Sequence, residues 1–333
     1  MPNISKTCLA ILPACWLALA AASAPAQTTS TGSGQAYPAR PVRVLVGFPP
    51  GAGVDITARL VTPKLAEALG QQFVVDNRAG AAGNIAAELA ARTPADGHTL
   101  LFASAPIVMS QSLYRNLNYN LERDFEAVGL IASAPFILVV HPSLPVKSVK
   151  ELVALARSRP GQLSFASTGN GSTPHLSMEM FKTRAGIDLV HVSYKGTPQA
   201  VIDIMSGQVP VMFANTLSVL PLIRGGRLRA LGISGAKRSA AAPEIMTIDE
   251  AGIKGFEAST WFGLFAPTGT PPAIVQRLST EIVRIVQQPE MRERLLAQGA
   301  DPIGMPAEEF RAYVKSELAK WSKVVQASGA KVE

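Results

Sequence analysis

The residues best suited to hold a ligand lie in FPPGAGVD, a turn from Phe48 to Asp55. The apolar run VRVLVG precedes this turn and a helical pattern follows it, so the turn joins a predicted strand to a predicted helix. The first N–H groups of a helix have no partner inside the helix, and glycine lets a ligand approach them closely. We therefore expect the turn to bind a carboxylate or another anion, with an ordinary strand-to-helix turn as the alternative.

Asp55 stands at the predicted helix start. A carboxylate there suits the helix dipole but repels a bound anion, so Asp55 is expected to cap the helix or to hold a water molecule or a ligand N–H group. The turn lacks both the G-x-x-x-x-G-K-[ST] and the G-x-G-x-x-G spacings, which excludes a nucleotide loop.

Further loops of the same design follow other predicted strands. NRAGAAGNIA places Asn84 at a helix start, and the two loops are expected to converge on one ligand. STGNGSTPHL, from Ser167 to Leu176, offers hydroxyl and amide side chains and is expected to leave N–H groups free before Pro174. YKGTPQA is another glycine turn, and MFANT places Asn215 just after a strand. Polar groups thus recur at the carboxyl ends of strands, where open α/β sheets bind ligands.

Signatures of catalysis are scarce. The chain has no G-x-S-x-G elbow, and its four histidines show no H-E-x-x-H or paired metal spacing, so neither a metal nor a cofactor is expected. A lone histidine such as His175, in the first turn of a helix, is more often a structural hydrogen-bonding residue than a catalyst. The rival from a different class is an exported hydrolase or isomerase that uses His175 with Ser172 or Asp55.

Composition favours a globular chain of two domains, with 333 residues of which 47% are hydrophobic and 17% charged. The formal net charge of +7 comes from scattered basic residues. Because they form neither a single-face cluster nor a pattern interleaved with aromatic residues, we expect a solvated surface and no nucleic-acid partner.

Residues 1–26 resemble an export signal, with Lys6, the apolar stretch CLAILPACWLALAAA and the small-residue site Ala24-Pro25-Ala26. The apolar run is shorter than the roughly 20 residues of a membrane-spanning helix. A lipoprotein box at Cys15 is disfavoured because the apolar run continues past it. Residues 27–36 are a predicted flexible tether. Both cysteines lie in the signal, so a mature chain without disulfides suits a bacterial periplasm.

From Tyr37 onward, short β-branched runs alternate with helical patterns, which predicts an α/β fold with a mixed, mainly parallel sheet and helices on both faces. Pro63 is expected to kink or split the first helix. The predicted strands are 42–47, 73–75, 99–103, a long run ending at Pro142, 163–166, 189–192, 211–213 and 228–233. The predicted helices are 55–69, 83–92, 149–157, 174–184, 197–205, 274–286 and 306–325. The strands and helices form two successive series, which predicts two α/β lobes. A cleft between two lobes is where small ligands usually bind.

Five long stretches of the chain carry a family likeness: YPARPVRVLVGFPPGAGVDITARL, DNRAGAAGNIAAELAARTPADGHTLLFAS, YKGTPQAVIDIMSGQVPVMFAN, WFGLFAPTGTPPAIVQRL and EFRAYVKSELAKWSKVVQ. They resemble the Bug (TctC-like) extracytoplasmic solute receptors of tripartite tricarboxylate transporters. This resemblance implies a two-lobe periplasmic binding protein fold, type II-like, with a ligand cleft between lobes. Lobe 1 would comprise residues 37–133 and 235–333, lobe 2 residues 134–234, and the strands crossing between them would lie near 133–136 and 231–234.

The resemblance also implies which residues hold the ligand. A carboxylate would be held by the glycine loops of lobe 1, and the other end of the ligand by loops of lobe 2. On the first wall these residues are Phe48, Pro49, Gly51, Ala52, Gly53, Asp55, Ala81, Gly83, Asn84 and Ser104. On the opposite wall they are Thr168, Gly169, Asn170, Ser172, His175, Lys195, Gly196 and Asn215. Where the family tends to have glycine, this chain has alanine in GAG and RAGAAG, which restricts φ and predicts a narrower or more apolar pocket.

By this resemblance the chain is a monomeric periplasmic receptor, and not an enzyme, that captures a small organic acid and delivers it to the membrane permease of such a transporter. An exported sensor for a two-component kinase is the alternative within the same class. The sequence does not identify the acid.

Overall fold

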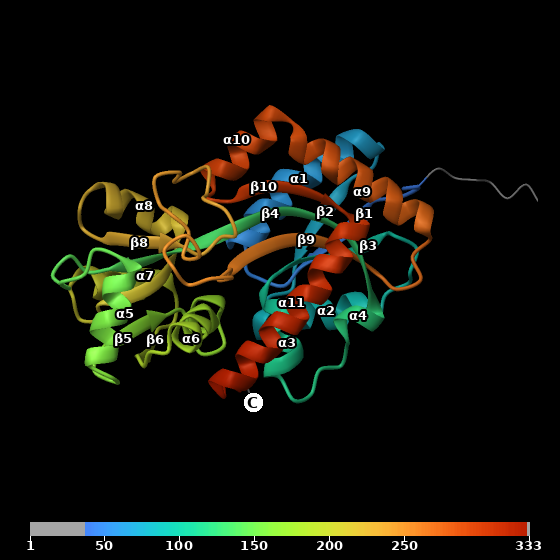
Figure 1. Ribbon diagram of the computed structural model, residues 1–333. Coiled ribbons are helices and arrows are strands. Elements are labelled where there is room, and N and C mark those ends of the chain that lie inside the picture. Colours follow the sequence, from blue (N-terminus) through green and yellow to red (C-terminus); the bar gives the residue numbers. More distant parts are fainter. Residues whose placement is uncertain (1–36, 332–333) are drawn as a thin grey trace, which may run out of the picture. The chain divides into compact units, whose positions relative to one another are not determined.

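The computed structural model describes residues 37–331 (Figure 1). The predicted export signal and tether, residues 1–36, lie outside the described part of the chain. The strands are β1 Val42–Val46, β2 Phe73–Asn77, β3 Thr99–Ser104, β4 Phe125–Val140, β5 Ser164–Ser167, β6 Val190–Ser193, β7 Val211–Asn215, β8 Arg229–Ile233, β9 Ser259–Pro267 and β10 Asp301–Pro306. The helices are α1 Gly53–Leu69, α2 Asn84–Ala91, α3 Pro106–Leu113, α4 Leu121–Asp124, α5 Val149–Ser158, α6 Thr173–Ala185, α7 Thr197–Met205, α8 Thr216–Arg224, α9 Pro272–Gln287, α10 Pro289–Ala297 and α11 Ala307–Ser328.

The strands form one mixed sheet in the order β2-β1-β3-β9-β4-β7-β5-β6, with β8 and β10 also paired to β4. The pairs within β2-β1-β3 and within β7-β5-β6 are parallel, as expected for βα units. The pairs made by β4 and β9 are antiparallel. The α/β class with a mixed sheet is therefore confirmed, and its antiparallel part lies in the middle.

The long strand β4 takes part in both halves of this sheet (Figure 1). Its residues up to Pro135 pair with β9, and Phe136 onward pairs with β7. The predicted crossing at 133–136 is thus the place where β4 changes partners. The other predicted crossing, 231–234, lies at the end of β8, and the chain returns to the first half later, at Ala258 just before β9. The exact division into lobes stays a prediction.

Helices cover both faces of the sheet because successive strand residues point to opposite faces. In β1, Val44 and Val46 pack with α1 and α9, whereas Leu45 belongs to the core that contains α2, α3 and α11. In the second half of β4, Ile137 packs with α7 and α8, and Leu138 packs on the opposite face with α5 and α6. This burial on both faces explains the nearly continuous apolar strands of the sequence.

Each predicted strand and helix has a counterpart in the structure, but the sequence did not predict α3, α4, α8, α10, β9 or β10. Pro63 was expected to kink or split the first helix; the split is wrong, because α1 is continuous through it. Pro63 lies on the exposed side of α1, where water can bind the carbonyl left without its N–H partner. The neighbouring Val61 and Leu65 are buried and anchor the helix on either side of the proline.

The buried core is close-packed where α11 crosses β9. A Cβ atom at Gly263 would clash with the ring of Phe310, which is itself fully buried. We expect Gly263→Ala to lower the free energy of unfolding by about 2 kcal/mol through overpacking. Urea denaturation measures this loss. The double variant Gly263→Ala/Phe310→Leu should lose less unfolding free energy than the two single variants lose together, because the smaller side chain relieves the clash. Losses that simply add would contradict the clash.

Candidate binding site between the strand-end loops

A cavity of about 520 Å³ opens where the loops after β1, β3, β5 and β7 meet. Its first wall comes from the loops after β1, β2 and β3, and its second wall from the loop after β5 together with the starts of α7 and α8. Within the described residues, no Lys, Arg, His, Asp or Glu lines it. The lining residues are Phe48, Ala52, Gly53, Val54, Ala82, Ser104, Pro106, Leu113, Tyr114, Phe136, Thr168, Gly169, Asn170, Gly171, Ser172, Thr173, Pro174, Thr197, Met212, Asn215, Thr260 and Phe262.

The loop before α1 is held from behind by Asp55, whose side chain is 2% exposed. Asp55 accepts hydrogen bonds from the N–H of Gly51 at 2.9 Å, from Nδ2 of Asn77 at 2.8 Å and from Nε of Arg59 at 3.0 Å. Asn77 Nδ2 also donates to the carbonyl of Phe48 at 2.9 Å. Burial opposes the ionisation of Asp55, but these hydrogen bonds outweigh it and hold its pKa below the usual value.

The start of α1 keeps its donors open. Ala52 N–H donates to the carbonyl of Pro49 at 3.2 Å, but the N–H groups of Gly53, Val54 and Asp55 have no hydrogen-bond partner within residues 37–331. Ser104, at the end of β3, lines the same cavity, is 6% exposed, and its hydroxyl has no partner in this part of the chain. This wall can therefore donate several hydrogen bonds to an anion at the positive end of a helix dipole.

The second glycine loop packs directly on the first. A Cβ atom at Gly47 would clash with Cα of Gly83, so the approach needs a glycine at position 47, and the positive φ of 96° favours a glycine at position 83. Beside Gly83, Ala81 and Ala82 adopt φ values of 48° and 56°, a region that costs an alanine about 1 kcal/mol or more. Ala82 lines the cavity, and Ala81 does not. The two loops thus lie against one another and both contribute to the cavity, but their convergence on one ligand stays a prediction, and only one of the two alanines reaches the cavity.

The loop after β5 uses three of its backbone donors inside the protein. Gly171 N–H donates to Nδ1 of His175 at 3.0 Å, and Ser172 N–H donates to the carbonyl of Gly169 at 3.2 Å. Gly169 N–H donates in turn to Oγ of Ser167 at 3.2 Å. The prediction of free N–H groups before Pro174 is therefore wrong for Gly171 and Ser172, because a side chain and a carbonyl of the same loop accept them. It agrees with Asn170 and Thr173, whose N–H groups have no hydrogen-bond partner within residues 37–331.

His175 lies behind this loop and not in the cavity. Its ring stacks on that of His191 at 4.0 Å between centroids, and His191 Nε2 lies 2.6 Å from Oγ of Ser167. Burial lowers the pKa of His175 and of His191 to about 4, so both rings are neutral near pH 7. His175 Nδ1 accepts from Gly171, which places its proton on Nε2. The ring thus has the structural role that the sequence favoured.

The predicted site residues divide into two groups. Those that line the cavity are Phe48, Ala52, Gly53, Ser104, Thr168, Gly169, Asn170, Ser172 and Asn215. Those that lie outside its lining are Pro49, Gly51, Asp55, Ala81, Gly83, Asn84, His175, Lys195 and Gly196. Several of the second group support the loops: Asn84, for example, is buried and accepts a hydrogen bond from the hydroxyl of Tyr119 at 2.7 Å. Lys195 is exposed.

Much of the apolar part of the lining has no distinctive sequence signal. Tyr114 directly follows α3, and Phe136, Met212 and Phe262 belong to strands, where an apolar residue also suits a core position. Asn77 was missed as the residue that joins Asp55 to Phe48. Its only sequence signal is its place at the last position of a strand, just before the second glycine loop.

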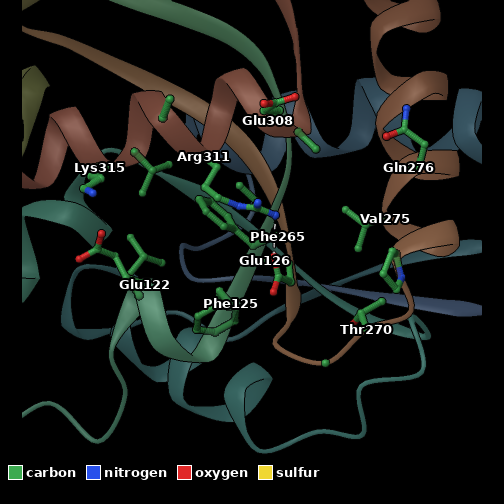
Figure 2. Close-up of a pocket in the computed structure, with 17 residues that line it drawn as sticks. Glu122, Phe125, Glu126, Phe265, Thr270, Val275, Gln276, Glu308, Arg311 and Lys315 are labelled. Atoms are coloured by element: carbon green, nitrogen blue, oxygen red, sulfur yellow. Dashed lines mark hydrogen bonds and ion pairs between the residues drawn. The ribbon is translucent and has the colours of Figure 1, made fainter.

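A larger cavity of about 1140 Å³ lies elsewhere, between α11, the start of α9 and the start of β4. Figure 2 shows Arg311 of α11 pointing across it toward Glu126 of β4, and the two form an ion pair at 2.8 Å. None of the predicted site residues lines this cavity. Three carboxylates (Glu122, Glu126 and Glu308) and two cations (Arg311 and Lys315) line it, so its lining carries more negative than positive side chains and favours an anion less than the loop cavity does.

Comparison with known proteins identifies the family. A family model described as "Tripartite tricarboxylate transporter family receptor" matches residues 57–330. The chain belongs to this receptor family. It is 38% identical over 303 residues to Protein BugT of Bordetella pertussis, covering 90% of this chain and 93% of that protein. The resemblance to the Bug (TctC-like) receptors is thereby confirmed.

Solved structures of family members share the fold. R. palustris Rpa4515 with adipate superposes with a TM-score of 0.75 at 38% identity, covering 89% of this chain and 100% of that one. MatC from Rhodopseudomonas palustris with bound malate gives a TM-score of 0.71 at 32% identity, over 87% of this chain and 100% of that one. The predicted periplasmic binding protein fold is thus confirmed. Among residues 37–331, no helix combines the length and apolar character needed to cross a membrane.

The Asp55 contacts predict a loss of both stability and binding when its charge is removed. Asp55→Asn places an amide where Arg59 and Asn77 both donate, so we expect the free energy of unfolding to fall by about 2 kcal/mol. Loosening of the turn at Gly51 should weaken binding of an organic acid at the same time. Thermal denaturation and calorimetric titration measure the two effects. Asp76→Asn is the matched control, since Asp76 pairs with Arg43 outside the loop, and equal losses of affinity in both variants would refute this role of Asp55.

The histidine stack predicts a loss of stability in mild acid. Unfolded histidine titrates near pH 6.5, above the folded value, so the unfolded chain binds more protons between pH 6.5 and 4. The free energy of unfolding should therefore fall by about 2 kcal/mol or more as the pH drops through this window. Urea unfolding at several pH values measures it. In His175→Asn, whose amide oxygen can accept from Gly171, the fall should shrink, and an unchanged pH profile would contradict the assignment.

Proposed function

We propose that this chain is an extracytoplasmic receptor that binds a small organic acid in the loop cavity and passes it to the permease of a tripartite tricarboxylate transporter. The observation that carries the proposal is the start of α1. Gly53, Val54 and Ser104 line the cavity there, and the two backbone N–H groups and the Ser104 hydroxyl have no partners in residues 37–331. The relatives named above are described with adipate and with malate, both carboxylic acids.

Binding without turnover fits the chemistry of the lining. Ser172 Oγ donates to the carbonyl of Gly169 at 2.7 Å, and His175 Nδ1 accepts from Gly171, so neither group is free to act on a ligand. Asp55 is buried behind its loop and fully engaged. These contacts speak against a hydrolase or isomerase built on Ser172, His175 or Asp55, and in favour of a ligand that leaves unchanged.

In this proposal the two lobes close on the ligand, and the permease recognises the closed receptor. The walls of the cavity come from loops of both sheet halves, so a ligand that touches both walls favours the arrangement in which they are close. The free energy of closure then comes from the ligand's extra contacts with the second wall. A permease that recognises the closed arrangement would take up only the loaded receptor. The export signal predicted in residues 1–26 is consistent with this place of action.

The test is ligand-induced stabilisation, followed by one matched pair of variants. A panel of organic acids should contain members that raise the melting temperature, since a ligand that binds only the folded state stabilises it by mass action. Ser104→Ala should weaken binding of the best acid by about threefold to tenfold, the cost of one hydrogen bond. Ser110→Ala, which removes another buried hydroxyl without a partner in the described chain, should leave the affinity unchanged.

Three results would overturn the receptor proposal. The first is a panel in which no acid stabilises the protein. The second is chemical conversion of the acid by the protein, which NMR spectra of the mixture would detect. The third is an equal loss of affinity in Ser104→Ala and Ser110→Ala.

A further inference from the structure

We propose that the permease docks in the groove between α6 and α11, through a permease segment that carries carboxylates beside apolar residues. This rests on the proposed function, because it presumes that the chain delivers an acid to a permease. The groove is separate from the loop cavity and shares none of its lining residues.

The charged side chains that line the groove are all cations. The groove has a volume of about 560 Å³ and forms where the C-terminal half of α11 lies beside α6 (Figure 1). Arg184 of α6 and Lys320 and Lys323 of α11 line it, and no Asp or Glu of the described chain does. A partner that presents carboxylates is therefore attracted to this groove, and a basic partner is repelled.

Two of the three cations keep their charge available to a partner. Lys320 forms ion pairs with Glu257 and Glu317, which offset its charge. Arg184 Nη1 donates to the carbonyl of Lys254 at 2.8 Å, which holds the guanidinium in place without neutralising it. Lys323 is exposed and has neither a hydrogen bond nor an ion pair within residues 37–331. Arg184 and Lys323 thus place a positive charge on each side of the groove.

The groove also offers apolar surface. Met180 of α6 and Val324 of α11 line it and are nearly buried, whereas Ala319 and Ala327 line it and are exposed. The short alanine side chains leave room between the two helices for apolar side chains of a partner. Burial of this surface favours association, and the cations select a partner that also carries carboxylates.

The helix α6 joins this groove to the loop cavity. Thr173 at the start of α6 lines the cavity, whereas Met180 and Arg184 in its last two turns line the groove. The other side of the groove is fixed to the first half of the sheet, because the buried carboxylate of Glu317 in α11 accepts from Nε1 of Trp261 in β9 at 3.1 Å. A ligand that draws the second wall toward the first therefore moves α6 relative to α11 and changes the groove. A permease segment that fits the changed groove recognises the loaded receptor.

Charge reversal in the groove tests docking separately from ligand binding. Lys323→Glu should leave the affinity for the best acid of the panel unchanged, because Lys323 does not line the loop cavity. In cells that lack the wild-type receptor, uptake of that acid with this variant should fall by about tenfold, since attraction becomes repulsion. Lys315→Glu makes the same change at an exposed position of α11 outside the groove and should support uptake at the wild-type rate.

The uptake measurements distinguish failure of the groove from failure of the receptor proposal. If Lys323→Glu supports uptake as well as the wild type, or if both variants lose it equally, the docking groove is refuted and the receptor proposal stands. If the wild-type chain binds the acid but its deletion leaves uptake unchanged, delivery to a permease fails, and the docking inference fails with it.

A photo-crosslinking group in the groove identifies the partner. Benzoylphenylalanine in place of Ala327, which is exposed in the groove, should capture a carboxylate-bearing permease segment in intact cells, and more strongly when the acid is present. The same group in place of Gln326, which is exposed on α11 but does not line the groove, should not capture it. Mass spectrometry identifies the crosslinked species. Crosslinks from position 327 to lipid or to a second copy of this chain, or the absence of any crosslink, would contradict the proposal.

Discussion

The buried carboxylate of Asp55 is the contact on which the binding wall depends. It accepts the N–H of Gly51 and leaves the next turn of N–H groups without competition from the protein's own side chains. Its negative charge does not repel a bound anion strongly, because Arg59 and Asn77 donate to the same carboxylate and spread that charge away from the cavity. The sequence left open whether Asp55 caps the helix, and the structure answers that it caps the turn before the helix.

The second constraint is the approach of the two glycine loops. Gly47 and Gly83 touch backbone to backbone, and no side chain fits between them. This contact brings the loop after β2 over the start of α1 and forces the chain through positive φ from Gly80 to Gly83, including two alanines. Such strain persists only where surrounding contacts maintain it. Here the strained backbone places Ala82 in the lining of the cavity. The expectation of a more apolar pocket agrees with this placement.

Much of the fold was predictable because its elements have strong local periodicity. The alternation of β-branched runs with amphipathic stretches identified β1 to β3 and α9 correctly, since both faces of the sheet are buried and the signal is continuous. β9 and β10 were missed because their identity depends on pairing with distant β4, and β10 contains two prolines that usually exclude a strand. Single-sequence reasoning has no access to such pairings.

The site shows the same division between local and distant causes. Glycine turns at strand ends are visible locally, so half of the predicted residues indeed face one cavity, such as Gly53 and Asn170. Whether a backbone donor in such a turn is free depends on side chains elsewhere. His175 accepts Gly171 N–H in one loop, and Asp55 accepts Gly51 N–H in the same way in the other. Two loops of similar sequence design are therefore held by the same contact, a side chain four residues further along that accepts a glycine N–H.

The strand β4 connects ligand contact to the arrangement of the two halves. Phe136 lines the cavity at the residue where β4 changes partners, and its N–H and carbonyl are both bonded to Ser234, which also donates to the carbonyl of Ala258. The outgoing and returning segments of the chain are thus tied together at one point beside the ligand. In the closure proposed above, a rotation about Phe136 would change the separation of the two walls, while the hydrogen bonds at Ser234 would keep the two segments together.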